Sequence, residues 1–478
     1  MKARLALLAA GALSLLLTGC PLTDHYELIS EDPANQAGAR PMGLQHGGAG
    51  GDDSGSNDGG GETASGASSG GALDLSSAGA LDTGGGTSPS TCCGSVCTDL
   101  TSDVANCGAC GAACSTGRAC VAGACQGGWV TMSAPPAEFV ARSRAAIVTA
   151  GKQVFFWGGQ DADGNALDNG AVYDPSTDTW TFLPTDTGTP SARLMASAVW
   201  TGTKVIVFGG TDAMGNPLHD GAIYNPGGNQ WTPLAPPASV SRRSSPYSYW
   251  DGTRAIFWGG LATATAGVAK ADRFDLAKWS SSTNAGDPGA IAFPTVGFDG
   301  ATLYLLGGLL NNVRQDKVYS YKASTDTWTS LAQSGLTPRS GGFGVWEGSR
   351  LVVWGGRDDN GLCSDGAYFA ANKWTPLSSN AAPTPRMVTL RRSGWSFEIR
   401  PGLIALLGGQ ISTALTGGLT TDGATYDVDT SVWSEIAGWP STEAHDYGMG
   451  VWTGAEFVLW GGRDSDGVVT STGERWAP

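Results

Sequence analysis

The sequence predicts an all-β protein whose main domain is a seven-bladed β-propeller, and three observations support this fold class. Glycine supplies 73 of the 478 residues and only 15% of residues are charged, a composition that excludes a helical bundle. The 18 tryptophans make the chain too aromatic to be disordered throughout. A double glycine after an apolar run recurs seven times at steps of 48 to 53 residues, at Gly158-Gly159, Gly209-Gly210, Gly259-Gly260, Gly307-Gly308, Gly355-Gly356, Gly408-Gly409 and Gly461-Gly462. Such a period indicates an array of small β-sheet units.

Each repeat is expected to form four antiparallel strands. The first strand, such as residues 339–346, is rich in glycine because innermost strands crowd around a tapering axis. Tight turns follow at pairs such as Asp251-Gly252, where glycine accepts a positive φ. The second strand, such as 205–208, is an unbroken apolar run, as expected when blades pack on both of its faces. Aromatic residues of the outer strands then fill the wedge between blades.

The same register surrounds every double glycine. About sixteen residues before the pair stands a basic residue in five repeats, at Arg142, Arg193, Arg243, Arg339 and His445. The outer strands carry a matching series of aromatic residues, at Tyr173, Trp180, Tyr224, Trp231, Phe274, Trp279, Trp328, Trp374 and Trp433. This register closely resembles the kelch motif, in which one repeat is one four-stranded blade. The resemblance implies a seven-bladed kelch propeller over residues 129–478.

The two ends of this domain predict how the ring closes. Residues 473–478 align with 170–175, the third strand of the first blade, so the last blade lacks a fourth strand. Residues 129–132 have the form of the outer strands 180–183 and 231–234. We therefore expect this N-terminal strand to complete the seventh blade, which removes the open sheet edges.

The N-terminus predicts export. Residues 1–19 combine Lys2 and Arg4 with an apolar run too short to span a bilayer, which is typical of a signal peptide. The ending Leu17-Thr-Gly-Cys20 resembles the lipobox of bacterial lipoproteins, which implies acylation of Cys20 and membrane attachment through a lipid anchor. By the same resemblance, Pro21 favours the outer membrane or the cell surface of the bacterial envelope.

Residues 20–91 are expected to form a flexible linker. They are rich in glycine, serine, alanine and aspartate and contain too few aromatic residues to build a core. After Cys20 the segment holds ten acidic residues and one basic residue, Arg40, so nine of the fifteen net negative charges lie here. A net charge of −15 also argues against nucleic acid as a partner, because phosphate binding needs clustered lysine and arginine.

Residues 92–125 predict a small module held by disulfides. Eight of the ten cysteines lie in these 34 residues, at Cys92, Cys93, Cys97, Cys107, Cys110, Cys114, Cys120 and Cys125. In an exported chain this density indicates four disulfides, whose connectivity stays open, although Cys107 and Cys110 have the spacing of half a zinc site. The pattern resembles the stigma-specific protein family, which adds no chemistry. Counting pairs leaves Cys363 unpaired.

The strand order places the candidate ligand site on one face of the ring. We define the top face as the face where each first strand begins, which also carries the loops between second and third strands. The basic series reaches this face and would form a partial collar, at Arg142, Arg193, Arg243, Arg339, Arg386 and His445. The kelch resemblance implies an anionic ligand held by forked hydrogen bonds. Alternatively, these arginines bind loop carboxylates and carbonyls and hold the blades.

Other chemistries find less support. The loops at 161–164, 358–361 and 464–467 are rich in aspartate and glycine, which fits calcium or, more simply, side-chain-capped turns. Galactose oxidase is also a seven-bladed kelch protein, but His219, His445 and Cys363 do not match its copper motif. We therefore expect no cofactor and no catalytic residues. The favoured function is a monomeric, membrane-anchored module that binds protein or glycan; a purely structural envelope protein is the alternative.

Overall fold

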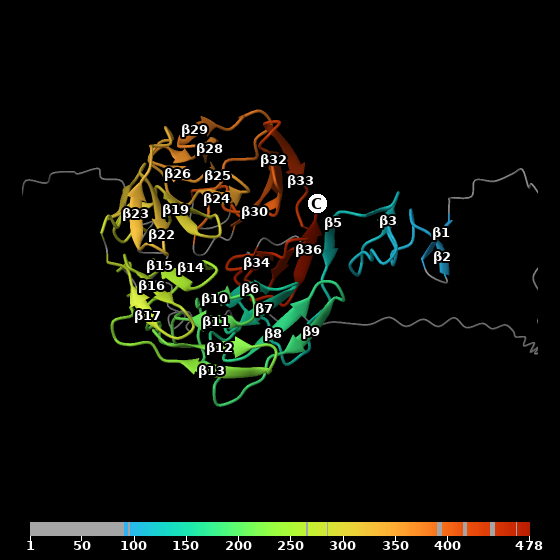
Figure 1. Ribbon diagram of the computed structural model, residues 1–478, viewed down its shortest axis with the longest axis horizontal. Coiled ribbons are helices and arrows are strands. Elements are labelled where there is room, and N and C mark those ends of the chain that lie inside the picture. Colours follow the sequence, from blue (N-terminus) through green and yellow to red (C-terminus); the bar gives the residue numbers. More distant parts are fainter. Residues whose placement is uncertain are drawn as a thin grey trace, which may run out of the picture.

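Seven four-stranded blades form a closed ring in the part of the chain that the structure describes (Figure 1). The computed structural model describes residues 90–93, 96–263, 266–283, 285–389, 394–413, 418–439, 445–464 and 466–478. The predicted signal peptide, Cys20 and the linker up to residue 89 lie outside the described residues. Across the described ranges, no helix is long and apolar enough to cross a membrane.

Each blade is an antiparallel sheet whose strands run from the axis outward in chain order, apart from the last. The strands of blades 1 to 3 are β6 (Ala146–Ala150), β7 (Gln153–Trp157), β8 (Gly170–Asp174), β9 (Thr179–Phe182), β10 (Ser197–Trp200), β11 (Val205–Phe208), β12 (Gly221–Asn225), β13 (Gln230–Leu234), β14 (Tyr247–Trp250), β15 (Ala255–Trp258), β16 (Ala271–Phe274) and β17 (Trp279–Ser281). Those of blades 4 and 5 are β18 (Thr295–Phe298), β19 (Thr302–Leu306), β22 (Val318–Lys322), β23 (Thr327–Ser330), β24 (Phe343–Glu347), β25 (Arg350–Trp354), β28 (Gly366–Ala370) and β29 (Lys373–Pro376). Those of blades 6 and 7 are β30 (Gly394–Arg400), β31 (Leu403–Gly408), β32 (Gly423–Asp427), β33 (Val432–Ile436), β34 (Met449–Trp452), β35 (Phe457–Trp460), β36 (Gly473–Ala477) and β5 (Gly128–Thr131). Two short hairpins project from blades 4 and 5, β20 (Leu309–Leu310) with β21 (Val313–Arg314) and β26 (Arg357–Asp358) with β27 (Gly361–Leu362).

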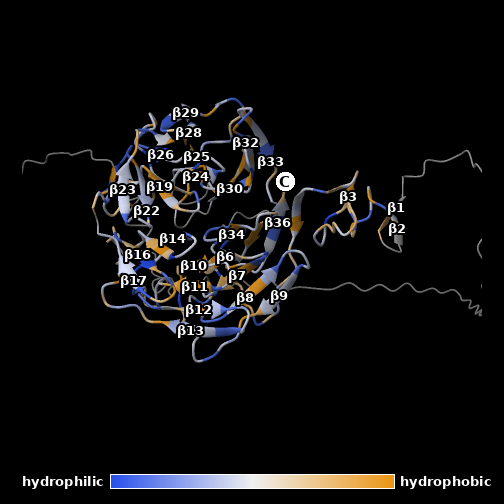
Figure 2. Cartoon of the chain, viewed as in Figure 1, coloured by the Kyte–Doolittle hydropathy of each residue, from blue (hydrophilic) through white to orange (hydrophobic). Residues whose placement is uncertain are grey.

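The hydrophobic core lies between blades rather than inside one layer. All four residues of β11 and of β15 are fully buried, as their unbroken apolar sequences predict. One cluster joins Phe155 and Trp157 of blade 1 to Tyr224 and Trp231 of blade 2. Figure 2 shows the same distribution, with hydrophobic residues on the inner strands β10 and β11 and hydrophilic residues on the outer strand β13. Each blade thus stabilises its neighbour by burying apolar surface against it.

The double glycine is required by close packing between adjacent blades. Gly158 and Gly159 have φ values of 68° and 99°, a region that other residues adopt at a cost. A Cβ atom on Gly158 would lie 2.5 Å from the carbonyl oxygen of Arg193 in the next blade. That carbonyl instead accepts a hydrogen bond from the Gly159 amide at 2.8 Å. The double glycine that marks each repeat in the sequence therefore lies where one blade contacts the next.

The predicted closure of the ring is confirmed. Strand β5 pairs with β36, with Trp129 opposite Trp476, and gives blade 7 its outer strand. The indole of Trp129 donates a hydrogen bond to the carbonyl of Ala437 at 2.8 Å. Its ring also lies 5.7 Å from that of Trp439, measured between ring centroids. The N-terminal strand thus connects blade 7 to the end of blade 6.

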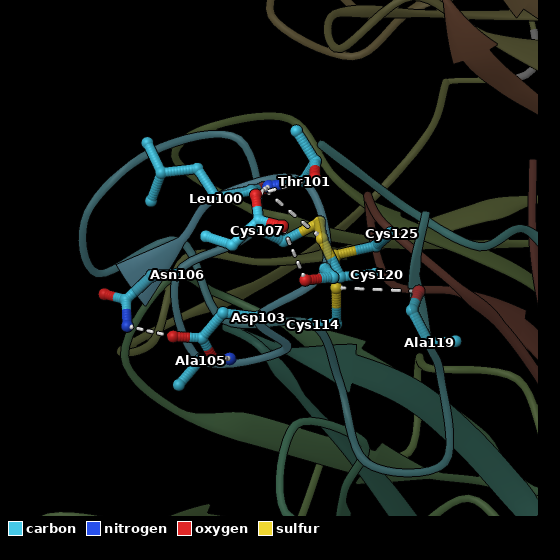
Figure 3. Close-up of a disulfide and its surroundings, with 12 residues drawn as sticks. Leu100, Thr101, Asp103, Ala105, Asn106, Cys107, Cys114, Ala119, Cys120 and Cys125 are labelled. Atoms are coloured by element: carbon cyan, nitrogen blue, oxygen red, sulfur yellow. Dashed lines mark hydrogen bonds between the residues drawn. A yellow bond between two sulfur atoms is a disulfide. The ribbon is translucent and has the colours of Figure 1, made fainter. Parts of the chain in front are cut away.

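The cysteine-rich module contains the four predicted disulfides, which join Cys92 to Cys97, Cys93 to Cys110, Cys107 to Cys120 and Cys114 to Cys125. Its strands are β1 (Ser90–Cys93), β2 (Val96–Asp99), β3 (Cys120–Val121) and β4 (Ala124–Cys125). Figure 3 shows the Cys107–Cys120 bridge beside Asp103, whose carboxylate accepts a hydrogen bond from the Asn106 amide at 2.9 Å. Hydrogen bonds from Thr98, Asn106 and Ala105 lower the pKa of Asp103. Disulfides and polar turns replace a hydrophobic core here.

This module is attached to the propeller through buried charged groups. Glu456, in the turn between β34 and β35, accepts from Arg118 Nε at 2.9 Å and from Arg475 Nη1 at 3.0 Å. The Ser115 hydroxyl group also donates to Glu456. Arg118, Glu456 and Arg475 are 7%, 5% and 1% exposed. The module therefore contacts the blade that β5 completes, immediately beside the closure.

Glu474 is a buried carboxyl group in the closing blade and makes stability depend on pH. It lies on β36 with 3% of its surface exposed, and burial raises its pKa from 4.5 to about 7. The folded chain therefore holds this proton more tightly than the unfolded chain, so stability falls as the pH rises through that interval. We expect Glu474→Gln to increase the free energy of unfolding at about pH 8, by at most about 3 kcal/mol, and to change it little at about pH 4.5.

Calorimetric unfolding of both chains at the two pH values measures this difference. The exposed Glu435 of β33 supplies the control, since Glu435→Gln should leave stability unchanged at either pH. A Glu474→Gln effect of equal size at both pH values would contradict the assignment.

Candidate functional site

The arginines of the predicted collar bind groups within their own blades. In each case Nη1 donates to the carbonyl of the first glycine in the double glycine of its own blade. These distances are 3.1 Å for Arg142 to Gly158, 3.1 Å for Arg193 to Gly209, 3.2 Å for Arg243 to Gly259, 3.1 Å for Arg339 to Gly355 and 3.1 Å for Arg386 to Gly408. Each arginine donates a second hydrogen bond to a side-chain oxygen at or just before the third strand, on Asn169, Asp220, Asp272, Asp365 and Asp422 respectively.

These five arginines are at most 2% exposed, so their guanidinium groups are not available to a ligand on the surface. Burial lowers the pKa of Arg142, Arg193 and Arg243, an effect that nearby aspartates oppose. The expected open collar is therefore corrected in favour of the alternative, in which the arginines bind carbonyls and carboxylates.

Two blades depart from this series. His445 is 3% exposed, and its Nδ1 contacts the carbonyl of Gly461, the same partner that the arginines choose. Ile291, which stands in the series in blade 4, is buried at 7% exposure. It lies against Gly308, where a Cβ atom would be 2.3 Å from its Cγ2.

The residue two positions beyond each member of this series forms a ring around the axis. We call this set the axial ring; it consists of Arg144, Met195, Ser245, Phe293, Gly341, Val388 and Tyr447. All except Val388 have a positive φ, between 48° and 66°. Backbone amides of the ring donate to the carbonyl of the preceding blade, from Met195 to Arg144 at 2.8 Å, Ser245 to Met195 at 2.9 Å, Gly341 to Phe293 at 2.8 Å and Val388 to Gly341 at 2.7 Å.

Left-handed backbone at five residues other than glycine costs free energy, which the surrounding structure must offset. The ring of hydrogen bonds supplies part of that compensation. It also fixes the direction in which each side chain of the axial ring leaves the backbone.

The axial ring surrounds a pocket of about 470 Å³ at the top face, lined by residues of all seven blades. One side is apolar and aromatic, with Tyr247 and Phe293 from blades 3 and 4 and Phe343 from blade 5. Glycines such as Gly344 and Gly450 also line the pocket, and they allow the inner strands to pack closely, since a Cβ atom would lie 2.2 Å from the Val296 carbonyl oxygen or 2.5 Å from the Trp395 ring in the neighbouring blade. Volume and lining are those of a ligand-binding pocket.

Arg144 lines the opposite side of the pocket, where blades 1 and 7 meet. Arg144 Nη1 and Arg463 Nη2 both donate to the side-chain oxygen of Gln160, at 3.1 Å and 2.9 Å. The Gln160 amide group donates to the Gly164 carbonyl at 3.0 Å, which orients that oxygen toward the two arginines. The Arg144 guanidinium lies over the ring of Tyr447, 4.1 Å from its centroid. Arg144 makes no ion pair within the described ranges, whereas Arg463 has a further partner besides Gln160.

Comparison with known families agrees with this architecture. The model described as the KLHDC2/KLHL20/DRC7 kelch-repeats domain matches residues 126–290. This match covers the first three blades of the propeller, which are therefore similar to kelch repeats. The model of the stigma-specific STIG1-like protein family matches residues 83–128, which include the cysteine-rich module.

Individual relatives of the kelch domain are distant. The F-box/kelch-repeat protein SKIP20 of Arabidopsis thaliana is 35% identical over 96 residues, which are 20% of this chain and 23% of that protein. The chain therefore spans about a quarter of the length of that relative. A solved structure titled "Structure of YjhT" is 18% identical, with a TM-score of 0.46 over 64% of this chain and 99% of the other.

The remaining candidates of the kelch domain lie apart from the pocket. Asp161, Asp358 and Asp464 each accept two backbone N–H bonds from their own loop through Oδ1, as expected for side-chain-capped turns. Cys363 is unpaired and buried, and burial raises the pKa of its thiol. Among the described residues, one group of His, Cys, Asp or Glu side chains is close enough to hold a metal, and its members Cys107, Cys114 and Cys125 are in disulfides.

Reasoning from the sequence therefore missed the residues at the mouth of the pocket. The predicted ligand-binding arginine lies two residues before the one at the pocket, since Arg142 is buried whereas Arg144 is half-buried and lines the pocket. The segment Arg142-Ser-Arg144 carried a usable signal, because its second arginine stands outside the register that the buried series repeats. The double-glycine neighbours Gln160 and Arg463 offered a further sign, because they vary between blades.

Proposed function

We propose that this protein is a membrane-anchored, extracytoplasmic binding module, attached through Cys20, whose axial pocket captures an acidic group of a protein or glycan partner. Arg144 carries this proposal, because it lines the pocket as a half-buried cation, makes no ion pair within the described ranges and hydrogen-bonds the neutral Gln160 oxygen. A ligand carboxylate placed there would accept charge-assisted hydrogen bonds in place of a neutral one. The apolar side formed by Tyr247 and Phe293 would receive an adjoining apolar group. The signal-like N-terminus, with its lipobox and acidic linker, supports a location in the bacterial envelope.

Two substitutions in one segment test the proposal. Arg144→Gln removes a charge from the pocket, so we expect loss of partner capture from envelope extract while the thermal midpoint stays unchanged. Arg142→Gln, two residues away, should instead destabilise the fold, because it removes a buried guanidinium from the Gly158 and Asn169 oxygens. Capture by the wild-type chain should also weaken as the salt concentration rises.

Immobilised full-length protein, with captured proteins and glycans identified by mass spectrometry, gives the readout. Lys278→Gln, on the opposite face, is the matched control for loss of one positive charge. Equal capture by the Arg144→Gln and wild-type chains would refute the binding role of the pocket and favour a purely structural envelope protein.

A further inference from the structure

A second cavity lies at the top face between blades 2 and 3. It measures about 640 Å³ and shares no lining residue with the axial pocket. Three segments form its walls: His219 from the loop between β11 and β12, residues 238–242 from the connection between the blades, and residues 262 and 267–270 from the loop between β15 and β16. Its size is that of a site for a small ligand or a few side chains of a peptide.

The lining carries positive charge without a matching negative charge. Arg242 and Lys270 are exposed, His219 is half-buried, and the lining holds no aspartate or glutamate in the described ranges. In the same part of the chain, neither Arg242 nor Lys270 forms an ion pair. The neighbouring carboxylates are engaged elsewhere, since Asp220 binds Arg193 and Asp272 binds Arg243. A locally cationic groove in a chain of net charge −15 repels cations and attracts anions at short range.

The loop of blade 3 differs from its counterparts in the residue that closes the turn. Blades 1, 2, 5 and 7 place an aspartate two residues after the double glycine, at Asp161, Asp212, Asp358 and Asp464, and its carboxylate accepts backbone N–H bonds. In blade 3 this position is Ala262, a residue that lines the groove. The groove thus lacks a carboxylate at this place, as do the loops of blades 4 and 6, where Leu310 and Ile411 stand.

The uncharged part of the wall is aliphatic. Val240 and Val268 are buried at 3% and 7% exposure, and Ala238 and Ala262 add small side chains. No phenylalanine, tyrosine or tryptophan lines the cavity among the described residues, so sugar rings would lack the large aromatic faces on which they usually stack. Aliphatic contacts in the same cavity as two cationic side chains instead suit a peptide with alternating acidic and aliphatic side chains.

We propose that the groove between blades 2 and 3 binds an acidic peptide segment of a partner protein. One carboxylate of the peptide binds Arg242 and Lys270, and a neighbouring aliphatic side chain packs over Val240 and Val268. This site is separate from the axial pocket and adds a second point of attachment on the same face, which strengthens binding when one partner reaches both.

Fluorescence anisotropy on the full chain tests this with a labelled hexapeptide, Gly-Glu-Leu-Glu-Val-Gly. We expect saturable binding that weakens by at least about tenfold in the Arg242→Gln, Lys270→Gln double variant and by a similar factor when the two peptide glutamates are replaced by glutamines. The Lys152→Gln, Lys278→Gln double variant loses the same charge at turns on the opposite face and should bind as the wild type does.

Two further measurements separate the sites and the ligand classes. Arg144→Gln should keep the affinity for the peptide, so failure of the axial proposal would leave this result intact. A tetramer of galacturonic acid should bind more weakly than the peptide. The proposal is overturned if the peptide does not bind, if the Arg242→Gln, Lys270→Gln variant retains full affinity, or if the acidic sugar is the tighter ligand.

Discussion

A chain that begins at residue 133 should lose the stable propeller, whereas one that begins at residue 127 should retain it. The longer chain keeps β5 and therefore the fourth strand of blade 7. The shorter chain exposes the edge of β36 and removes the contacts of Trp129 with Trp439 and Trp476. We expect a loss of at least about 4 kcal/mol in the free energy of unfolding, similar to the loss of a large buried aromatic side chain.

Denaturant unfolding followed by tryptophan fluorescence measures the difference between these two chains. Both lack the cysteine-rich module, so the comparison isolates β5. Trp129→Ala in the full chain is a milder change, because it removes the ring contacts of Trp129 but keeps the hydrogen bonds between β5 and β36. Equal unfolding midpoints for the chains beginning at 127 and 133 would contradict closure by the N-terminal strand.

Replacing Glu456 by alanine should destabilise the full chain by about 3 to 5 kcal/mol. The change leaves Arg118 and Arg475 buried without the carboxylate that both contact. The cost arises mainly from these two unpaired charges rather than from the lost attraction itself. Thermal unfolding monitored by circular dichroism gives the measurement, and Glu435→Ala at an exposed position should shift the midpoint little.

A double-mutant cycle shows whether the module supplies part of this stability. Arg118→Ala and Glu456→Ala should be strongly non-additive, because the two side chains are in direct contact at 2.9 Å. In a chain that begins at residue 127, Glu456→Ala should cost less than in the full chain, since Arg118 is then absent. Additive effects would show that the contact between the module and the propeller contributes nothing to stability.

The ring was predictable because each blade repeats its own local signals. Seven double glycines, apolar second strands and outer tryptophans each predict the same blade structure. An error in one blade therefore changes the predicted fold little. The closure by β5 was also predictable, because residues 129–132 resemble outer strands and residues 473–478 resemble a third strand. The number of disulfides followed from the cysteine density, whereas their connectivity depends on a fold with almost no regular structure.

The burial of the five collar arginines was not predictable from their position in the repeat. An arginine that binds a ligand and one that binds a glycine carbonyl occupy the same kind of position in a repeat. The positive φ of residues such as Gly158 decides between them, because it turns a carbonyl toward the guanidinium. The contact of the module with the propeller was hidden for another reason: Arg118 and Glu456 are separated by 338 residues, so no local pattern relates them.

The attachment of the module beside the closure also determines how the molecule carries mechanical load. Tension applied to the chain before Ser90 reaches the cross-linked module first, and the disulfides limit how far it can extend. The force then divides between the Arg118–Glu456 contact and the β5–β36 ladder. Loads shared in this way rupture at higher force than a ladder opened one hydrogen bond at a time. A propeller held to a surface by its N-terminal chain would therefore keep its ring closed while a partner pulls on the top face.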